Sequence, residues 1–278
     1  MFQLSDVVKN LLILNVLFFV GTWIDASMGS PLRLEEILPL YYPGSDKFMP
    51  MQLVTHFFMH ANFMHIAFNM FALVMFGPPL EMRWGAKKFL IFYLLCALGS
   101  AALHMGWTWY NFSGMEQTID LFRANPSAEL FQNFFDGGAD RIFNDAGQQM
   151  VAQITGQLAA TGQLSGDLTS QAVEVMQKAR EFSMDTPMVG ASGAIYGLLL
   201  GFGMTFPNHK LMLIFLPVPI AAKYFIPALM LIELFLGFQR YSWDPIAHFA
   251  HLGGALVGLL IILYWRRQGP PGVDRWDR

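Results

Sequence analysis

The chain has 278 residues, of which 54% are hydrophobic and only 13% are charged, and its formal net charge is −3. Soluble globular domains carry about 25% charged residues, so much of this protein's surface is expected to face lipid. The same figures exclude a disordered chain, a collagen-like fold and a disulfide-rich secreted domain, and they give no reason to expect a nucleic-acid partner.

Six apolar stretches have the length of membrane-spanning helices, since a bilayer core of about 30 Å requires about 20 helical residues. In chain order they cover roughly residues 8–26, 52–76, 86–107, 188–206, 219–237 and 246–265. The first has few flanking cations and no clear small-residue cleavage site, and five further stretches follow it. We therefore interpret it as a true span rather than a signal peptide. The sequence predicts an all-α, polytopic membrane protein with six transmembrane helices.

Lys and Arg are distributed unequally between the two sides of this arrangement. The side that holds both termini has ten cations and four carboxylates, whereas the opposite side has seven cations and fifteen carboxylates. Because cytoplasmic loops carry an excess of Lys and Arg, we expect both termini to be cytoplasmic.

A long polar segment, residues 108–186, separates the third and fourth stretches. Two apolar stripes at helical spacing run through it: Ile142, Ala146, Met150, Ile154 and Leu158, then Leu168, Ala172, Val175, Met176, Ala179 and Phe182. Gly162 to Gly166 breaks the pattern, and Asp167 has the position of an N-cap. We predict an extracytoplasmic helical hairpin with a less regular lead-in over residues 116–140. A solvated spacer and a substrate-gating or partner-binding cap are both open interpretations of it.

The predicted organisation therefore has four parts. Residues 1–107 form transmembrane helices 1–3, residues 108–186 form the insertion, residues 187–267 form helices 4–6, and residues 268–278 form a cytoplasmic tail.

Polar residues inside a span are energetically costly, so each is a functional hypothesis. His65 and Asn69 are four residues apart in the second stretch and would share one face of a helix. His60 would lie about 140° around an ideal helix from His65, so it could not line the same site. We interpret His56 and His60 as interfacial, supporting residues near the outer end.

Small residues form ridges at a spacing of four on two of the stretches. The ridges are Gly193, Gly197 and Gly201 on the fourth, and Ala250, Gly254 and Gly258 on the sixth. Such ridges let two helix backbones approach closely. Ser192 and His251 each lie one residue from a ridge, near the outer end of its helix, which predicts a Ser–His hydrogen bond. The competing interpretation is helix packing with incidental polar residues.

A Ser–His pair of this kind suits acyl transfer. His251 would accept the Ser192 proton as a general base and later protonate the leaving amine. The Asn69 amide, a His65 ring N–H and the Ser192 backbone N–H would donate to the oxyanion. No acid is evident to orient His251, so the sequence predicts a catalytic dyad, with Tyr196 packing against the imidazole and steering it.

These motifs together resemble the rhomboid family of intramembrane serine proteases. The chain contains His60-x4-His65-x3-Asn69, Gly77-x3-Glu81-x3-Gly85, Gly190-x-Ser192-Gly193 followed by Tyr196, and Ala250-His251-x2-Gly254, in the family's order. The resemblance implies a six-helix rhomboid fold that cleaves single-span or otherwise membrane-anchored proteins near the outer face of the bilayer. It also implies that the enzyme needs no metal or other cofactor, and a bacterial cytoplasmic membrane is the expected location.

The resemblance also implies roles for individual residues. Ser192 would be the nucleophile, His251 the base, and His65 and Asn69 members of the oxyanion hole. Supporting roles fall to Tyr196, Gly190, Gly193 and His60, and structural roles to Glu81, Arg83, Gly197, Gly201, Gly254 and Gly258. Glu81 and Arg83 would tie the second and third spans together. The chain departs from the family in two places: residues 27–51 lack the frequent Trp-Arg pair, and the insertion is unusually long.

Two other functional classes stay open at this stage. His56-x3-His60 and His248-x2-His251 have ligand-like spacing for a membrane metalloenzyme, although position 57 is Phe where zinc proteases have Glu. A non-catalytic protein that binds and escorts membrane proteins is the other alternative. Glu233, in the fifth stretch, has no evident partner in the sequence.

Overall fold

In the computed structural model, five helices among the described residues have the length and apolar composition to cross a membrane. They are α1 (Asp6–Ser27), α4 (Phe63–Trp84), α5 (Ala86–Ala124), α10 (Ala222–Gln239) and α11 (His248–Gln268). A further apolar helix, α9 (Ser192–Thr205), has 14 residues. The protein is thus a mostly helical, polytopic membrane protein. At 1.5 Å per residue α9 extends only about 21 Å, so the count of six spanning helices stays a prediction.

The structure describes residues 4–135, 143, 145–213, 216–239 and 246–268. Several residues used in the sequence analysis lie outside these ranges: Ile142, Arg141, Arg240, residues 136–140 of the lead-in and residues 269–278 of the tail. Within the described part, β1 (Lys210–Leu213) and β2 (Leu216–Ala221) form a two-stranded antiparallel sheet between α9 and α10.

The second span begins later than the hydropathy predicts. The chain first forms α2 (Leu34–Ile37), α3 (Gln52–Thr55) and the 3-10 helix η1 (His56–Phe58), and α4 begins only at Phe63. Asn62 caps α4, because its side-chain oxygen accepts a hydrogen bond from the His65 backbone N–H at 2.9 Å. The predicted span 52–76 is therefore wrong at both ends.

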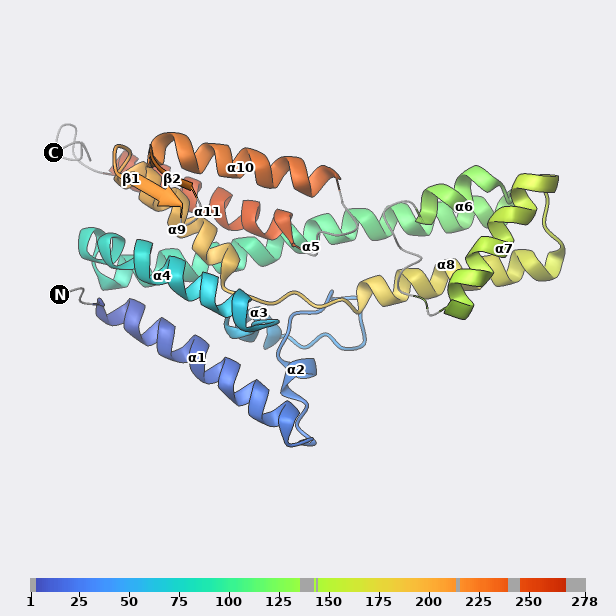
Figure 1. The fold of residues 1–278 in the computed structure, drawn as a ribbon, viewed down its shortest axis with the longest axis horizontal. Helices are drawn as coiled ribbons and strands as arrows, with labels where there is room; N and C mark the ends of the chain where they lie inside the picture. The colour runs from blue at the N-terminus through green and yellow to red at the C-terminus, as the bar shows by residue number, and fades with distance from the viewer. Residues whose placement is uncertain (1–3, 136–142, 144, 214–215, 240–245, 269–278) are drawn as a thin grey trace.

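The insertion is carried by α5, which has 39 residues and continues well past the predicted end of the third span. It is completed by α6 (Ala128–Phe135), α7 (Asp145–Thr161) and α8 (Gly166–Met184), which gather at the far end of α5 from the helix bundle (Figure 1). The helices α7 and α8 follow the two predicted stripes. The predicted N-cap is wrong, because the cap of α8 is Ser165, whose hydroxyl accepts from the Leu168 N–H at 3.3 Å.

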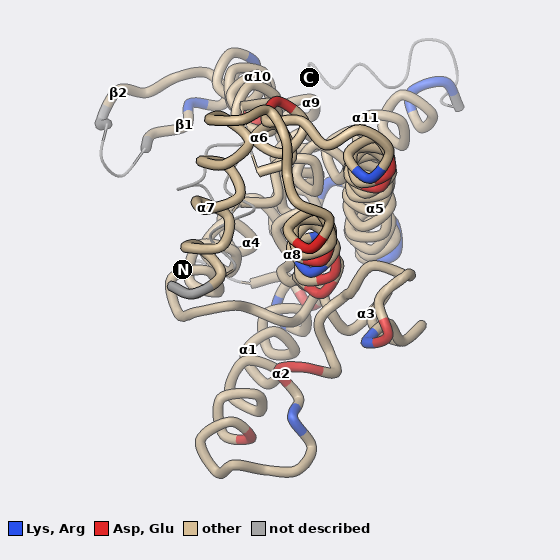
Figure 2. Tube along the Cα trace, turned by 90° about the vertical axis from the view of Figure 1, so that its right-hand side faces the viewer, with Lys and Arg blue, Asp and Glu red and all other residues tan. Residues whose placement is uncertain are grey.

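The insertion packs around its own hydrophobic cluster. Phe122 of α5, Phe131 of α6, Ile154 of α7 and Met176 of α8 are all fully buried there. Figure 2 shows charged residues along α8 and the outer part of α5. An apolar interior with a charged exterior is the pattern of a water-exposed helical unit.

Small residues bring α9 and α11 together, as the ridges predict. A Cβ added at Gly254 would strike the Gly193 backbone, and one added at Gly258 would lie 3.3 Å from the Gly197 carbonyl oxygen. The helix α5 closes the third side with Cys96 and Ser100 against Gly197 and Gly193. Gly201 does not face α11, although the predicted ridge includes it.

The position of Gly201 faces aromatic rings rather than α11. A Cβ there would lie 2.8 Å from the Trp84 ring and 3.3 Å from the Phe92 ring. The ridge of α9 that contacts α11 therefore consists of Gly193 and Gly197.

Glu81 has a different structural role from the one that the resemblance implies. Its carboxylate accepts hydrogen bonds from the Ser5 hydroxyl at 2.5 Å and from the backbone N–H groups of Val7 and Val8 at 3.1 and 3.0 Å. The first N–H groups of a helix have no partner within the helix, and the Glu81 carboxylate supplies acceptors for two of them at the start of α1. It ties the second span to the first rather than to the third.

Candidate active site

Ser192 and His251 meet at the same end of two closely packed helices. Ser192 is the first residue of α9, and His251 lies in the first turn of α11. The His251 Nε2 atom is 3.0 Å from the Ser192 Oγ atom, which is hydrogen-bond distance. The backbone contact between Gly193, one residue after Ser192, and Gly254, three residues after His251, makes this approach possible.

A carboxylate contacts His251, although the sequence prediction placed no acid there. The Glu233 Oε2 atom lies 3.0 Å from His251 Nδ1 and 2.7 Å from His248 Nδ1. The Tyr196 hydroxyl donates to the other carboxylate oxygen. The Tyr196 ring stacks on the His251 imidazole with a centroid separation of 4.1 Å and an interplanar angle of 8°. Ser192, His251 and Glu233 thus form a continuous hydrogen-bonded series.

The sequence analysis missed this role because Glu233 and His251 are on different helices and form no motif. One signal was available: Glu233 is a single carboxylate in an otherwise apolar span. A carboxylate inside a membrane is costly unless it has partners, so its presence indicated a polar partner on a neighbouring helix.

Two donors of the predicted oxyanion hole have no hydrogen-bond partner within the described residues or the helix. Asn69 is buried, and its Nδ2 atom has no hydrogen-bond partner among the described residues. Buried donors are nearly always paired in folded proteins, so an unpaired one indicates a place for a missing acceptor. The Ser192 backbone N–H belongs to the first turn of α9, where N–H groups have no intrahelical partner.

The His65 ring faces the same place. The Ala61 N–H points to His65 Nδ1 at 3.4 Å, which favours a lone pair on Nδ1 and the proton on Nε2. The Nε2 edge lies against Gly190: a Cβ added at Gly190 would be 2.8 Å from His65 Nε2 and 3.7 Å from Ser192 Oγ. The backbone of Gly190 has φ +118°, a region that favours glycine, so the position excludes side chains for two reasons.

His60 is nearer to the site than helical geometry predicts. Its ring centroid is 5.0 Å from that of His65, because α4 begins at Phe63 and His60 lies in the preceding loop. The ideal-helix argument that separated these two histidines was wrong, since only one of them is helical.

Hydrogen bonds to the loop between the first and second spans hold the chain just before Ser192. Leu40 and Met188 exchange two backbone hydrogen bonds of 3.0 and 2.8 Å. The Gly190 N–H donates to the His56 carbonyl at 2.9 Å. These bonds fix the approach of the chain to α9 and hence the position of Ser192.

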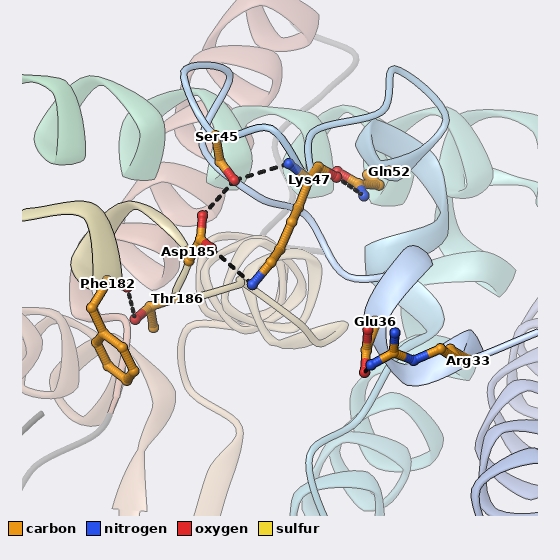
Figure 3. A network of polar contacts seen from close by, with 8 residues as sticks. All are labelled: Arg33, Glu36, Ser45, Lys47, Gln52, Phe182, Asp185 and Thr186. Carbon is orange, nitrogen blue, oxygen red and sulfur yellow. Dashed lines mark hydrogen bonds and ion pairs between the residues drawn. The ribbon is translucent and has the colours of Figure 1, made fainter. Parts of the chain in front are cut away.

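A polar cluster reinforces this junction (Figure 3). The Ser45 hydroxyl donates to Asp185 at 2.6 Å, and the Lys47 ammonium lies 2.8 Å from the other Asp185 oxygen. The hydrogen bonds from Lys47 and Ser45 hold the pKa of the Asp185 carboxyl below its ordinary value. Gln52 is buried and bonds the Ile37 and Lys47 carbonyls. The end of the insertion is thereby attached to the first loop.

A cavity of about 460 Å³ lies beside His248, between the bundle and the insertion. It is lined by Trp107 and Met115 of α5, by Ser183 and Thr186 at the end of α8, and by Leu236 of α10. The insertion therefore borders the region of the Ser–His pair.

The histidines do not all gather into the cluster that the metalloenzyme alternative would require. In the part of the chain that the structure describes, one group has three possible ligand atoms within 4.8 Å of one another: Glu233, His248 and His251. His56 does not join it, and its Nδ1 atom bonds the Gln52 carbonyl at 2.6 Å.

Comparison with known proteins identifies the family. A model of the Rhomboid domain matches residues 47–114 and 141–268, more than half of the chain. The chain belongs to the rhomboid family. The match includes Ser192, His251 and Glu233 and omits residues 115–140, which lie in the insertion.

Two curated rhomboids resemble this one over short segments. "Rhomboid-like protease 3" of Toxoplasma gondii is 35% identical over 65 residues, which is 23% of this chain and 25% of that protein. "Rhomboid protein 1, mitochondrial" of Saccharomyces cerevisiae is 35% identical over 74 residues, which is 27% of this chain and 21% of that protein. Each alignment thus spans a quarter of the relative's length or less.

Proposed function

We propose that this rhomboid is an intramembrane serine endopeptidase that cleaves membrane-anchored proteins in or near their transmembrane segments, with Ser192 as nucleophile and His251 as base. The observation that carries the proposal is the 3.0 Å contact between Ser192 Oγ and His251 Nε2 at the N-terminus of α9. Two observations support an oxyanion hole: the His65 ring lies against Gly190 close to Ser192 Oγ, and the buried Asn69 amide, one turn further along α4, is unpaired within the described residues. Family membership supports the same activity.

The geometry is suited to acyl transfer in two steps. Ser192 Oγ attacks the scissile carbonyl carbon while its proton moves to His251 Nε2, and the carbonyl oxygen becomes an oxyanion that Asn69 and His65 stabilise. The C–N bond then breaks, and His251 returns the proton to the leaving amine. Water repeats the sequence on the acyl-enzyme, releasing the second product and restoring the Ser192 hydroxyl.

Membrane physics limits the substrate. A transmembrane helix satisfies its own carbonyl groups, so a segment must unwind before Ser192 can attack it. We therefore propose single-span substrates with small residues and a weak helix near the cleavage site. The distribution of Lys and Arg supports cytoplasmic termini and an active site that opens on the extracytoplasmic side. We propose a bacterial cytoplasmic membrane as the location. In this arrangement residues 108–186 form an extracytoplasmic unit beside the site.

The proposal is tested with the purified full chain and a panel of single-span substrates. Wild-type protein should cleave at least one of them, and the Ser192→Ala variant should cleave none. Cleavage by both proteins would contradict the assignment of Ser192. Loss of wild-type activity with a chelator, restored by Zn²⁺, would favour the metalloenzyme that the group of Glu233, His248 and His251 otherwise allows. Stable substrate binding without cleavage would favour an escort protein.

A further inference from the structure

We propose that Glu233 is a positioning residue that completes a Ser192–His251–Glu233 triad, because it holds the His251 imidazole in the tautomer that accepts the Ser192 proton. The inference rests on the proposed function, and it replaces the dyad that the motifs indicate. The juxtaposition that carries it is a buried carboxylate of α10 at 3.0 Å from the His251 nitrogen that faces away from Ser192.

Glu233 points into the bundle from an otherwise lipid-facing stretch of α10. Its side chain is only 7% exposed, whereas the neighbouring Leu231, Ile232 and Phe235 are 67%, 53% and 55% exposed. A buried carboxylate is costly unless it is paired and hydrogen-bonded. Here it accepts three hydrogen bonds, from Tyr196 on one oxygen and from His248 and His251 on the other.

The donor and acceptor roles of these groups determine the His251 tautomer. An ionised carboxylate has only acceptor sites, so each histidine nitrogen bonded to it must carry a proton. The His251 proton is therefore on Nδ1, and in the neutral imidazole Nε2 is an unprotonated acceptor. That is the atom 3.0 Å from Ser192 Oγ. With the opposite tautomer, Nε2–H would point at Ser192 and no base would be available.

Tyr196 ties the carboxylate to the imidazole. Its hydroxyl donates to Glu233 while its ring stacks on His251 at 4.1 Å. One residue of α9 therefore restrains both the acid and the base. The His251 ring is held at its face by Tyr196, at Nδ1 by Glu233 and at Nε2 by Ser192.

The same carboxylate stabilises the charge that the reaction creates. When Ser192 Oγ bonds to the substrate carbon, its proton moves to His251 Nε2 and the ring becomes an imidazolium. Glu233 stays ionised, keeps its bond to Nδ1–H and lies next to the new positive charge. When the C–N bond breaks, the Nε2 proton leaves with the amine and the neutral tautomer is restored.

The groups around His251 make Glu233 the source of this effect. The titratable neighbours from the packed helices are His65 of α4, His104 of α5, Tyr196 of α9, and His248 of α11 itself. Among these neighbours of His251 within the described residues, Glu233 is the one carboxylate. Its neutralisation should therefore move the acid side of the pH–activity profile, because imidazolium would no longer be favoured by an opposite charge.

The decisive variant is Glu233→Gln, which keeps the size of the side chain. Its amide N–H₂ would donate to His251 Nδ1 and favour the wrong tautomer. We expect kcat to fall by about 100-fold to 10,000-fold with KM changed by less than about threefold. The pH of half-maximal kcat on the acid side should fall by about one unit or more. Glu174→Gln is the matched control, since Glu174 is an exposed residue of α8 paired with Lys178, and it should retain full activity.

The variant Glu233→Asp separates positioning from packing. A triad requires the negative charge, so the Glu233→Asp variant should be more active than Glu233→Gln. It should also keep the acid side of the wild-type pH–activity profile. A purely structural role requires the volume, so Gln should then retain more activity than Asp. If the Gln variant does not fold, the acid limb of the Asp variant decides, and a shift of one unit would overturn the proposal.

The remaining outcomes distinguish the two proposals. Cleavage that depends on Ser192, together with a Glu233→Gln variant of unchanged kcat and pH profile, would overturn the triad alone. Cleavage by Ser192→Ala would overturn the proposed function itself. Inhibition of the wild type by a chelator, with rescue by Zn²⁺, would show that Glu233, His248 and His251 are metal ligands and would also overturn the triad.

Discussion

The contact between α9 and α11 allows a quantitative prediction for Gly254→Ala. A Cβ at this position would overlap the Gly193 carbonyl oxygen, its nearest neighbour, and would lie 2.5 Å from the Gly193 carbonyl carbon, whereas ordinary contacts begin at 3.4 Å. Both atoms belong to the backbone, so the helices must separate by at least about 0.9 Å. Gly193 and Gly254 lie one and three residues after Ser192 and His251, so the same shift would lengthen the 3.0 Å catalytic contact to about 3.9 Å.

A contact of about 3.9 Å is no longer a hydrogen bond, and a misplacement of about 1 Å can cost about 100-fold in rate. We expect Gly254→Ala to lower kcat about 100-fold and to lower the free energy of unfolding by about 1–3 kcal/mol. The assay is cleavage of a single-span substrate in detergent micelles, with thermal denaturation measured on the same preparation.

Two matched Gly→Ala variants provide controls. In Gly258→Ala the new Cβ would lie 3.0 Å from the Phe92 ring and 3.3 Å from the Gly197 backbone, so the effect on kcat should be less than tenfold. Gly114→Ala meets nothing within 4 Å in α5 and should be fully active and slightly more stable. A Gly254→Ala protein with the kcat of Gly114→Ala would refute the inference that this contact positions the two catalytic residues.

Three further predictions concern the surroundings of the site. Asn69→Ala removes an unpaired donor and should lower kcat by about 100-fold to 1,000-fold with little change in KM, as measured by steady-state cleavage; an unchanged kcat would exclude Asn69 from the oxyanion hole. Gly190→Ala adds a Cβ 2.8 Å from the His65 ring at φ +118°, and should cost about 1–3 kcal/mol of unfolding free energy in a denaturation experiment; wild-type stability would contradict the strain argument. Asp185 has a lowered pKa when folded because of Lys47, so its pairing stabilises the protein above the unfolded pKa of about 3.9 and is lost as pH falls through the folded value. Both side chains are partly exposed, so Asp185→Asn should cost less than about 1 kcal/mol at pH 7 and progressively less as the pH falls through the folded pKa, and a cost that grew on acidification would have the wrong sign.

The pairing of Ser192 with His251 could be predicted from the sequence, because small residues at a spacing of four specify a close helix contact. The ridge on α11 and its partners on α9 are local patterns, and the polar residues beside them follow from helical geometry. The stripes of α7 and α8 were predictable for the same reason, since periodicity is a property of a single segment.

The lone carboxylate in an apolar span indicated a polar partner on another helix, but the identity of that partner was not predictable, because Glu233 reaches His251 through tertiary packing of α10 against α11. The start of α4 was also missed: hydropathy continues through residues 52–62, and only the Asn62 cap ends the preceding loop. That boundary decides where His60 lies. In both cases a contact between distant segments, or a single capping hydrogen bond, outweighs the local apolar pattern.

The most direct test of the account is the labelling of Ser192 by a fluorophosphonate, with the adduct located by mass spectrometry of the intact, purified protein. Such a probe reacts with a serine only when a neighbouring base has activated it. The account predicts one adduct, on Ser192, that competes with substrate and is lost in the His251→Ala variant. Labelling that persists at full rate in His251→Ala, or an adduct on another residue with Ser192 unmodified, would contradict it.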